Sequence, residues 1–143
     1  MAIVSILGRL LLCAIFLMSA VGNKIPKFEQ VVGYMESKGV PQAKYALMAA
    51  IAFLIIGSLS VIVGFRARFG AFLLALFLIP TTYYFHNPAA HPAESPEAQA
   101  EMIQLMKNAG LFGAMLFIIA NGSGAGSLDK GCCVREDEEP LKK

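Results

Sequence analysis

Few side chains of this sequence could do chemistry, because ionisable residues are scarce inside its long apolar blocks. Arg9 lies about two helical turns into the first block, and an ionisable group inside a membrane is a functional candidate by default. The alternative is that Arg9 extends to the nearby headgroups, which its position also allows. Asp129 follows the last block. If both chain ends lie at one membrane face, an Arg9–Asp129 ion pair would join the first and last spans.

The two histidines are the side chains whose unperturbed pKa lies nearest neutral pH. His86 stands at the end of the third apolar block, where it could exchange protons at the membrane edge. His91 and Glu94 follow, but their spacing lacks the pattern of a metal site, so we predict no metal. A solvated or interfacial histidine is the simpler interpretation. Asn108 adds a polar amide to the last block.

The segment Gly122-Ser-Gly-Ala-Gly resembles a phosphate-binding loop in composition alone. Phosphate loops follow a strand and open a helix, whereas this segment follows an apolar helix. We therefore predict a helix C-terminal turn whose glycines adopt positive φ.

Three cysteines without a CxxC spacing argue against a disulfide framework and against a zinc site. We expect Cys13, inside the first block, to be inert. Cys132 and Cys133 lie beyond Asp129 and keep three interpretations open: lipidated, redox-active or unmodified tail thiols.

The elements that position these side chains follow from hydropathy. The chain has 143 residues, 57% of them hydrophobic, and a mean hydropathy of +0.62. Its apolar residues form long blocks that are almost free of charge, which is typical of membrane spans. The net charge of +2 and the scattered basic residues argue against nucleic acid as a partner. We predict an all-α, integral membrane bundle of four transmembrane helices, at about residues 3–21, 46–64, 69–85 and 102–121.

The first block could instead be a signal peptide, since Ala20-Val21-Gly22 would pass as a cleavage site. No basic residue precedes the apolar run, however, and the run exceeds the roughly 7–15 residues of the apolar core of a typical signal peptide. We therefore predict an uncleaved span.

A short amphipathic helix is predicted between the first two spans, after Pro26. Its apolar side chains follow the i, i+3, i+4, i+7 rule, and they are Phe28, Val31, Val32 and Met35. Gly39 and Pro41 should end it. Two placements stay open: in the membrane interface with the apolar face down, or packed on the end of the bundle.

The remaining connections fix the topology. The four residues 65–68 leave only a short turn, so the second and third spans must be antiparallel. Ser95-Pro96-Glu97 is a strong helix start. The uncharged core of the last span, residues 109–120, is too short to cross a bilayer at about 1.5 Å per residue, so Lys107 and Asn108 must lie within or just under the headgroups. We expect residues 1–129 to form one membrane domain and residues 130–143 a charged, disordered tail.

Four spans place both termini on one side of the membrane. That side holds six lysines and arginines outside the spans and the other side holds five, which is a small excess. The turn with Arg66 and Arg68, which contains no acid, favours cytoplasmic termini.

Several of these segments together resemble a known family. Gly8-Arg9-Leu-Leu-Leu and Ser19-Ala-Val-Gly-Asn-Lys24 look like the first helix of the DoxX/DoxD-like family of small four-helix membrane proteins. Further segments fit the same order: Gly39-Val40-Pro41, residues 64–68, His86, Lys107-Asn108 and the glycine-rich turn up to Asp129. The resemblance covers nearly the whole chain to Asp129 and leaves the tail with Cys132 and Cys133 outside.

The resemblance implies a function in general terms. Some members of the family are the membrane subunit of a thiosulfate:quinone oxidoreductase, others are implicated in oxidative or thiol stress, and distant relatives are cargo receptors or chaperones. It implies an accessory or anchor subunit of a quinone- or thiol-linked redox assembly in a plasma or bacterial inner membrane, and the sequence shows no catalytic residue of its own. No cofactor is evident in the sequence, and quinone is the one that the resemblance would allow. Partners would be the bilayer, redox subunits or a second copy.

In that interpretation one inter-helix pocket would be lined by Arg9, His86, Asn108 and Asp129. A structural, chaperone-like membrane protein, whose polar residues only pack helices, is the alternative. A small transporter is a further one, although it would need more charge within the spans than Arg9 supplies.

Overall fold

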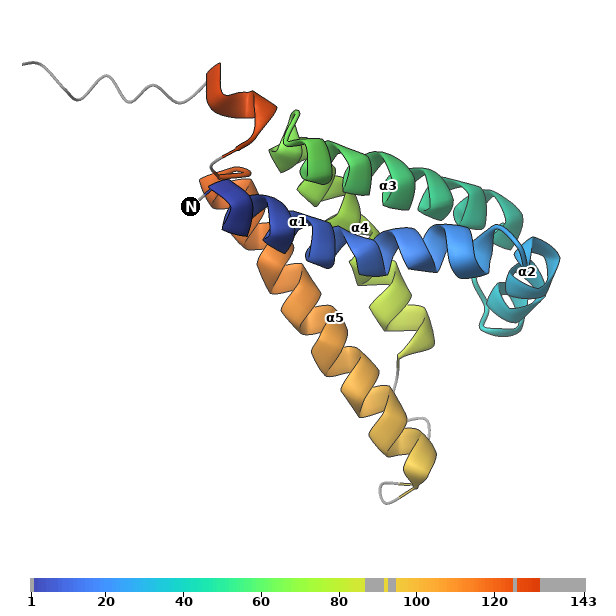
Figure 1. Cartoon of the computed structure of the whole chain (residues 1–143). Coiled ribbons are helices and arrows are strands. Elements are labelled where there is room, and N and C mark those ends of the chain that lie inside the picture. Colours follow the sequence, from blue (N-terminus) through green and yellow to red (C-terminus); the bar gives the residue numbers. More distant parts are fainter. Residues whose placement is uncertain (1, 87–91, 93–94, 125, 132–143) are drawn as a thin grey trace, which may run out of the picture.

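The structure is a computed structural model that describes residues 2–86, 92, 95–124 and 126–131. Its architecture is all-α (Figure 1). Among the described residues four helices are long and apolar enough to cross a membrane: Ala2–Lys24, Ala43–Val63, Ala67–Phe85 and Pro96–Asn121. The predicted bundle of four spanning helices is confirmed. The candidate residues His91, Glu94, Cys132 and Cys133, and most of the predicted tail, lie outside the described residues.

The first span changes its helical winding near its end. Helix α1 covers Ala2–Leu17 and continues as a π-helix, η1, over Met18–Lys24. A π-helix bonds each N–H to the carbonyl five residues earlier, as Ile25 N does to Ala20 O at 3.0 Å. Such turns are rare and are frequent at functional sites. The wider winding brings Ser19 and Lys24, which are five residues apart, to the same side of the helix.

The short helix α2, Phe28–Ser37, packs on the end of the bundle. Its buried side chains Val32 and Met35 form a small apolar cluster with Ala43 and Leu47 of helix α3, Ala43–Val63. The structure therefore supports the second of the two placements left open by the sequence: the apolar face of α2 packs on α3 at the end of the bundle. Gly39 ends this segment with φ +76°, as predicted.

Helices α3 and α4, Ala67–Phe85, form an antiparallel pair with close backbone contact (Figure 1). A Cβ added to Gly57 would lie 2.9 Å from the Gly70 carbonyl oxygen, and one added to Gly70 would lie 2.7 Å from that of Gly57. The turn between the helices needs left-handed backbone at Gly64, φ +70°, and at Arg66, φ +48°.

Helix α5, Pro96–Asn121, packs on α4, and α1 packs on α3. Ser95 caps α5 as predicted, since its Oγ accepts a hydrogen bond from Ala98 N at 3.1 Å. The shared core is apolar and contains fully buried side chains from all four spans, among them Cys13, Leu54, Leu74 and Met115. The outward side chains are also apolar, as lipid requires.

Candidate functional site

Residues 122–124 and 126–131, here called the clasp, lie against the N-terminal end of α1 and the α3–α4 turn (Figure 1). The clasp starts where Gly122 ends α5 with φ +78°, and Gly124 and Gly126 also have positive φ. This confirms the predicted helix C-terminal turn. The clasp ends in a short 3-10 helix, η3, Leu128–Gly131.

Arg9 of α1 is held by the clasp and by its own helix. Its side chain is 5% exposed, its Nη2 donates to Gly126 O at 3.0 Å, and its Nε donates to Ser5 O at 3.4 Å. One turn earlier, Ser5 Oγ donates to Ser123 O at 3.2 Å. The other terminal nitrogen, Nη1, is buried against Gly64, whose absent Cβ would lie 2.3 Å away. Arg9 is therefore turned inward and does not extend to headgroups.

Asp129 binds the α3–α4 turn through backbone groups. Its Oδ1 accepts a hydrogen bond from Arg66 N at 2.9 Å, and its Oδ2 accepts one from Ala67 N at 3.0 Å. Its own backbone N–H donates to Gly64 O at 2.9 Å. The first N–H groups of a helix have no partner within the helix and carry a partial positive charge. A carboxylate from a distant segment thus caps α4.

The predicted Arg9–Asp129 ion pair is wrong. The ion pair found among the described residues joins His86 and Glu101 instead. Arg9 and Asp129 do tie α1 and α4 to the end of α5, but each does so through main-chain atoms. Asp129 also contacts the predicted basic turn, but through the backbone N–H of Arg66 and not through its side chain. The side chain of Arg68 lies near Gly122.

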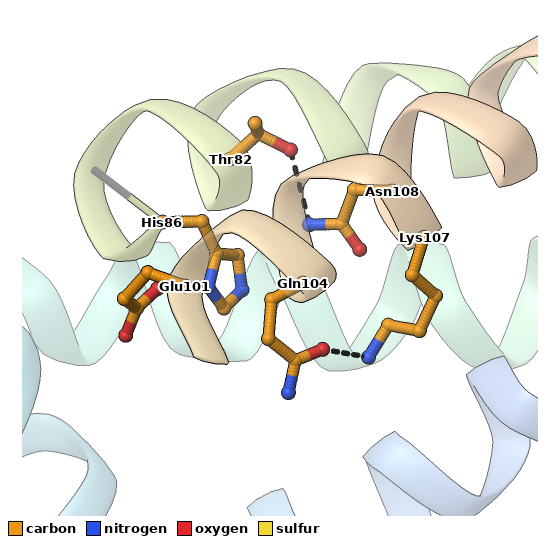
Figure 2. A network of polar contacts seen from close by, with 6 residues as sticks. All are labelled: Thr82, His86, Glu101, Gln104, Lys107 and Asn108. Atoms are coloured by element: carbon orange, nitrogen blue, oxygen red, sulfur yellow. Dashed lines mark hydrogen bonds and ion pairs between the residues drawn. The ribbon is translucent and has the colours of Figure 1, made fainter. Parts of the chain in front are cut away.

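At the opposite end of the bundle, polar contacts join α4 to α5 (Figure 2). His86 Nδ1 lies 2.9 Å from Glu101 Oε2, with both side chains partly exposed. Two turns further along α5, the buried Asn108 donates from Nδ2 to Thr82 Oγ1 at 3.1 Å. These contacts set the antiparallel register of the two helices at this end.

A cavity of about 330 Å³, here called the α2 chamber, lies at the same end. Side chains from η1, α2, α3, α4 and α5 line it. Its apolar and aromatic wall includes Tyr34, Met35, Leu47, Phe77 and Tyr84, and its polar groups include Asn23, Lys24, His86 and Glu101.

Asn108 and Thr82 line a different hollow, a nearly apolar groove of about 370 Å³ along the α4–α5 seam. The groove and the chamber use opposite faces of α4, since the groove takes Ile79 and Tyr83 and the chamber takes Pro80 and Tyr84. The four predicted pocket residues are thus not brought together. His86 lines the chamber, Asn108 lines the groove, and Arg9 and Asp129 contact the clasp or belong to it.

Two charged residues of the chamber, Lys24 and Glu101, were not predicted as site residues from the sequence. Lys24 Nζ donates to Ser19 Oγ at 2.6 Å and lies 5.3 Å from the centre of the Phe77 ring. A spacing of five residues does not indicate contact in an α-helix, so the sequence carried no usable signal for this pair. Glu101 did carry one, because it begins a row of polar residues at three-residue spacing with Gln104 and Lys107, whose side chains share a hydrogen bond (Figure 2).

The chamber combines an ammonium donor, an imidazole–carboxylate pair and aromatic walls. Such a site can bind an amphipathic molecule whose polar head accepts hydrogen bonds. Within the described ranges, no three His, Cys, Asp or Glu side chains are grouped as a metal site would require.

Comparison with known proteins gives consistent similarities. Residues 4–87 match the family model described as DoxX. Over 127 residues the chain is 30% identical to the inner membrane protein YqjF of Escherichia coli, which covers 89% of this chain and 91% of that protein. It is 29% identical over 109 residues to the inner membrane protein YphA of the same organism, with 75% of each chain covered. No solved structure matches the chain.

Proposed function

The chain belongs to the DoxX family of multi-pass inner-membrane proteins, and we propose that it is a non-enzymatic accessory subunit that binds a quinone headgroup for a membrane redox assembly. The observation that supports this proposal is the α2 chamber. It is a cavity with apolar walls and a few convergent polar groups, which is the usual character of a small-molecule site.

The size and chemistry of the chamber suit a quinone ring. A volume of about 330 Å³ falls at the lower end of the range for ligand pockets, as expected for a single headgroup. Phe77 and Tyr84 offer aromatic surfaces against which a flat ring can pack. Lys24 supplies N–H donors for a carbonyl oxygen.

The His86–Glu101 pair suits a proton-coupled carrier. Reduction of a quinone to a quinol takes up two electrons and two protons. A histidine bonded to a carboxylate can act as a proton relay between the headgroup and water. The electrons would come from a partner subunit, so the chain's own part would be to bind and orient the headgroup.

The test is to measure quinone in the protein purified in a mild non-ionic detergent. We expect native mass spectrometry and solvent extraction to find quinone in the wild-type protein. Phe77→Trp adds bulk inside the chamber and should lower the quinone content about tenfold or more. Phe72→Trp is the matched control, since Phe72 is on the same helix, is 52% exposed and should leave the content unchanged.

Wild-type protein that carries no quinone and binds none on addition would contradict the proposal. Partner subunits identified in the same preparation would show whether the electron donor is a peripheral or a membrane protein.

The clasp favours a second candidate function. Arg9 and Asp129 tie helices together and do not line the chamber or the groove. This is the role expected of polar residues in a structural or chaperone-like membrane protein. If the chamber binds no ligand while clasp variants lose stability, this second function becomes the better one.

A further inference from the structure

We propose that Lys24 makes the α2 chamber selective for headgroups that carry a negative charge, so that its preferred ligands are acidic quinones such as ionised hydroxyquinones. This inference rests on the proposed function, because it names the ligand class of the same cavity. Lys24 is then a residue that determines which ligands the chamber prefers.

The first observation is the direction of the Lys24 side chain. Lys24 is the last residue of the first span, and a lysine there would be expected to extend outward to the headgroups. Its Nζ instead donates to Ser19 Oγ, five residues back toward the middle of the span. The ring that it faces, Phe77, lies eight residues before the end of α4, which is about 12 Å along the helix. The ammonium is therefore directed into the chamber.

The second observation is that both contacts of this ammonium are with neutral groups, a hydroxyl and an aromatic ring. In the part of the chain that the structure describes, the ion pair is between His86 and Glu101, and Lys24 Nζ has no carboxylate oxygen within 4.0 Å. A partly buried cation without a counter-charge favours an anion that can enter beside it. The chamber that Lys24 lines gives such an anion space.

Glu101 is the opposing charge in this cavity. Its Oε2 is already bound to His86 Nδ1 at 2.9 Å, so this oxygen is engaged on the α5 side of the chamber. Glu101 should still repel an anion to some extent. Removing its charge should therefore strengthen anion binding, while removing the charge of Lys24 should weaken it.

The π-helix gives Lys24 this direction. In a continuous α-helix the residue that follows Ser19 on the same face would be residue 22 or 23. Because η1 bonds five residues back, residue 24 takes that place and its side chain lies over Ser19. The irregular winding is thus the feature that turns a terminal lysine into a group of the cavity.

The experiment compares a naphthoquinone with its ring-hydroxylated analogue, which is nearly the same size and is an anion at neutral pH. Binding to the purified full chain is measured by equilibrium dialysis in a non-ionic detergent, with empty micelles as the blank. We expect the wild-type protein to bind the anionic compound roughly tenfold more tightly, since charge-assisted hydrogen bonds are about twice as strong as neutral ones.

Four variants separate charge from packing. Lys24→Met should lose the preference for the anionic compound, and Lys24→Arg should keep the preference, which shows that the site is still folded. Glu101→Gln should increase the preference. Lys44→Met is the matched control, because Lys44 is an exposed lysine at the same end of the bundle and should leave the preference unchanged.

The possible failures can be told apart. If both compounds bind with equal affinity to the wild-type protein, selectivity by Lys24 is overturned and the quinone site stands. A preference that survives in Lys24→Met overturns it as well. If neither compound binds, the proposed function itself fails, and this inference fails with it.

Discussion

Arg9 and Asp129 carry opposite charges at the same end of the bundle, yet each is satisfied by main-chain atoms of another segment. The reason is that helix ends and glycine-rich turns leave backbone groups without partners. Gly126 O and the N–H groups of Arg66 and Ala67 are such groups, and they are fixed in place by the turns that contain them. An ion pair would require two long side chains to be ordered against each other.

The first prediction concerns the cap on α4. Asp129→Ala removes both acceptors of the Arg66 and Ala67 N–H groups and should lower the free energy of unfolding by about 1 kcal/mol. Asp129→Asn keeps one side-chain oxygen and should lose less. The measurement is thermal unfolding in detergent, followed by circular dichroism. An alanine variant that unfolds at the wild-type temperature would mean that the clasp contributes no stability to α4.

For single residues, the sequence indicated which polar side chains form contacts between elements, but it did not indicate their partners. Arg9, Asp129 and Asn108 are polar groups in or beside apolar blocks, and each forms a contact between elements in the structure. Their partners could not be predicted, because they depend on the path of the clasp and on the register of α4 against α5. Lys24 was missed for a local reason, since no sequence rule used here anticipates the π-helix.

Among the elements, α3 and α4 make the closest pair. Gly57 and Gly70 face each other, and each would place a Cβ within 3 Å of the other's carbonyl oxygen. In a membrane, helices gain little from excluding lipid, so such close packing is a main source of their association. The pair therefore depends on the absence of two side chains.

The second prediction tests this pair. Gly70→Ala would place a methyl group 2.7 Å from backbone of α3 and should destabilise the bundle by roughly 1–3 kcal/mol. Gly110→Ala in α5 is the matched control, because nothing lies within 4 Å of its Cβ position. The control should be neutral or slightly stabilising, as alanine favours helix. Both are compared by thermal unfolding in one detergent, and equal midpoints would refute close α3–α4 packing.

The spans themselves were predictable, because uncharged apolar blocks of the required length leave few alternatives. Their ends were predicted less well. The first span continues to Lys24 through the π-helix, and α4 begins at Ala67, earlier than hydropathy suggested. The start of α4 depends on a cap from Asp129, and such a distant contact has no local signature in the sequence.

The whole molecule has an apolar middle and two polar ends with different roles. The clasp end holds α1, α4 and α5 together, and the opposite end holds the α2 chamber and the His86–Glu101 pair. The α2 chamber and the contacts that anchor the helices are therefore separated by the thickness of the bundle. Variants of the clasp should change stability, and variants of the chamber should change binding.

The orientation of this two-ended molecule decides from which side of the membrane a partner reaches the chamber. Ser5 contacts Ser123, so the start of α1 and the end of α5 lie at one face, together with the Arg66 turn. We predict that this face is cytoplasmic, because its turn is basic and contains no acid. Reporter fusions at Lys143 and after Pro92 test this, and only the first should report a cytoplasmic location.

The opposite result would place the clasp end at the outer face and the chamber end at the cytoplasmic face, since both ends belong to the same four spans. In the predicted orientation the α2 chamber lies toward the outer face, and the electron donor of the proposed quinone site would then have to contact the protein from that side. If the Pro92 fusion is the cytoplasmic one, a cytoplasmic reductase could reach the chamber directly. The topology experiment therefore also selects the compartment in which the proposed redox partner should be sought.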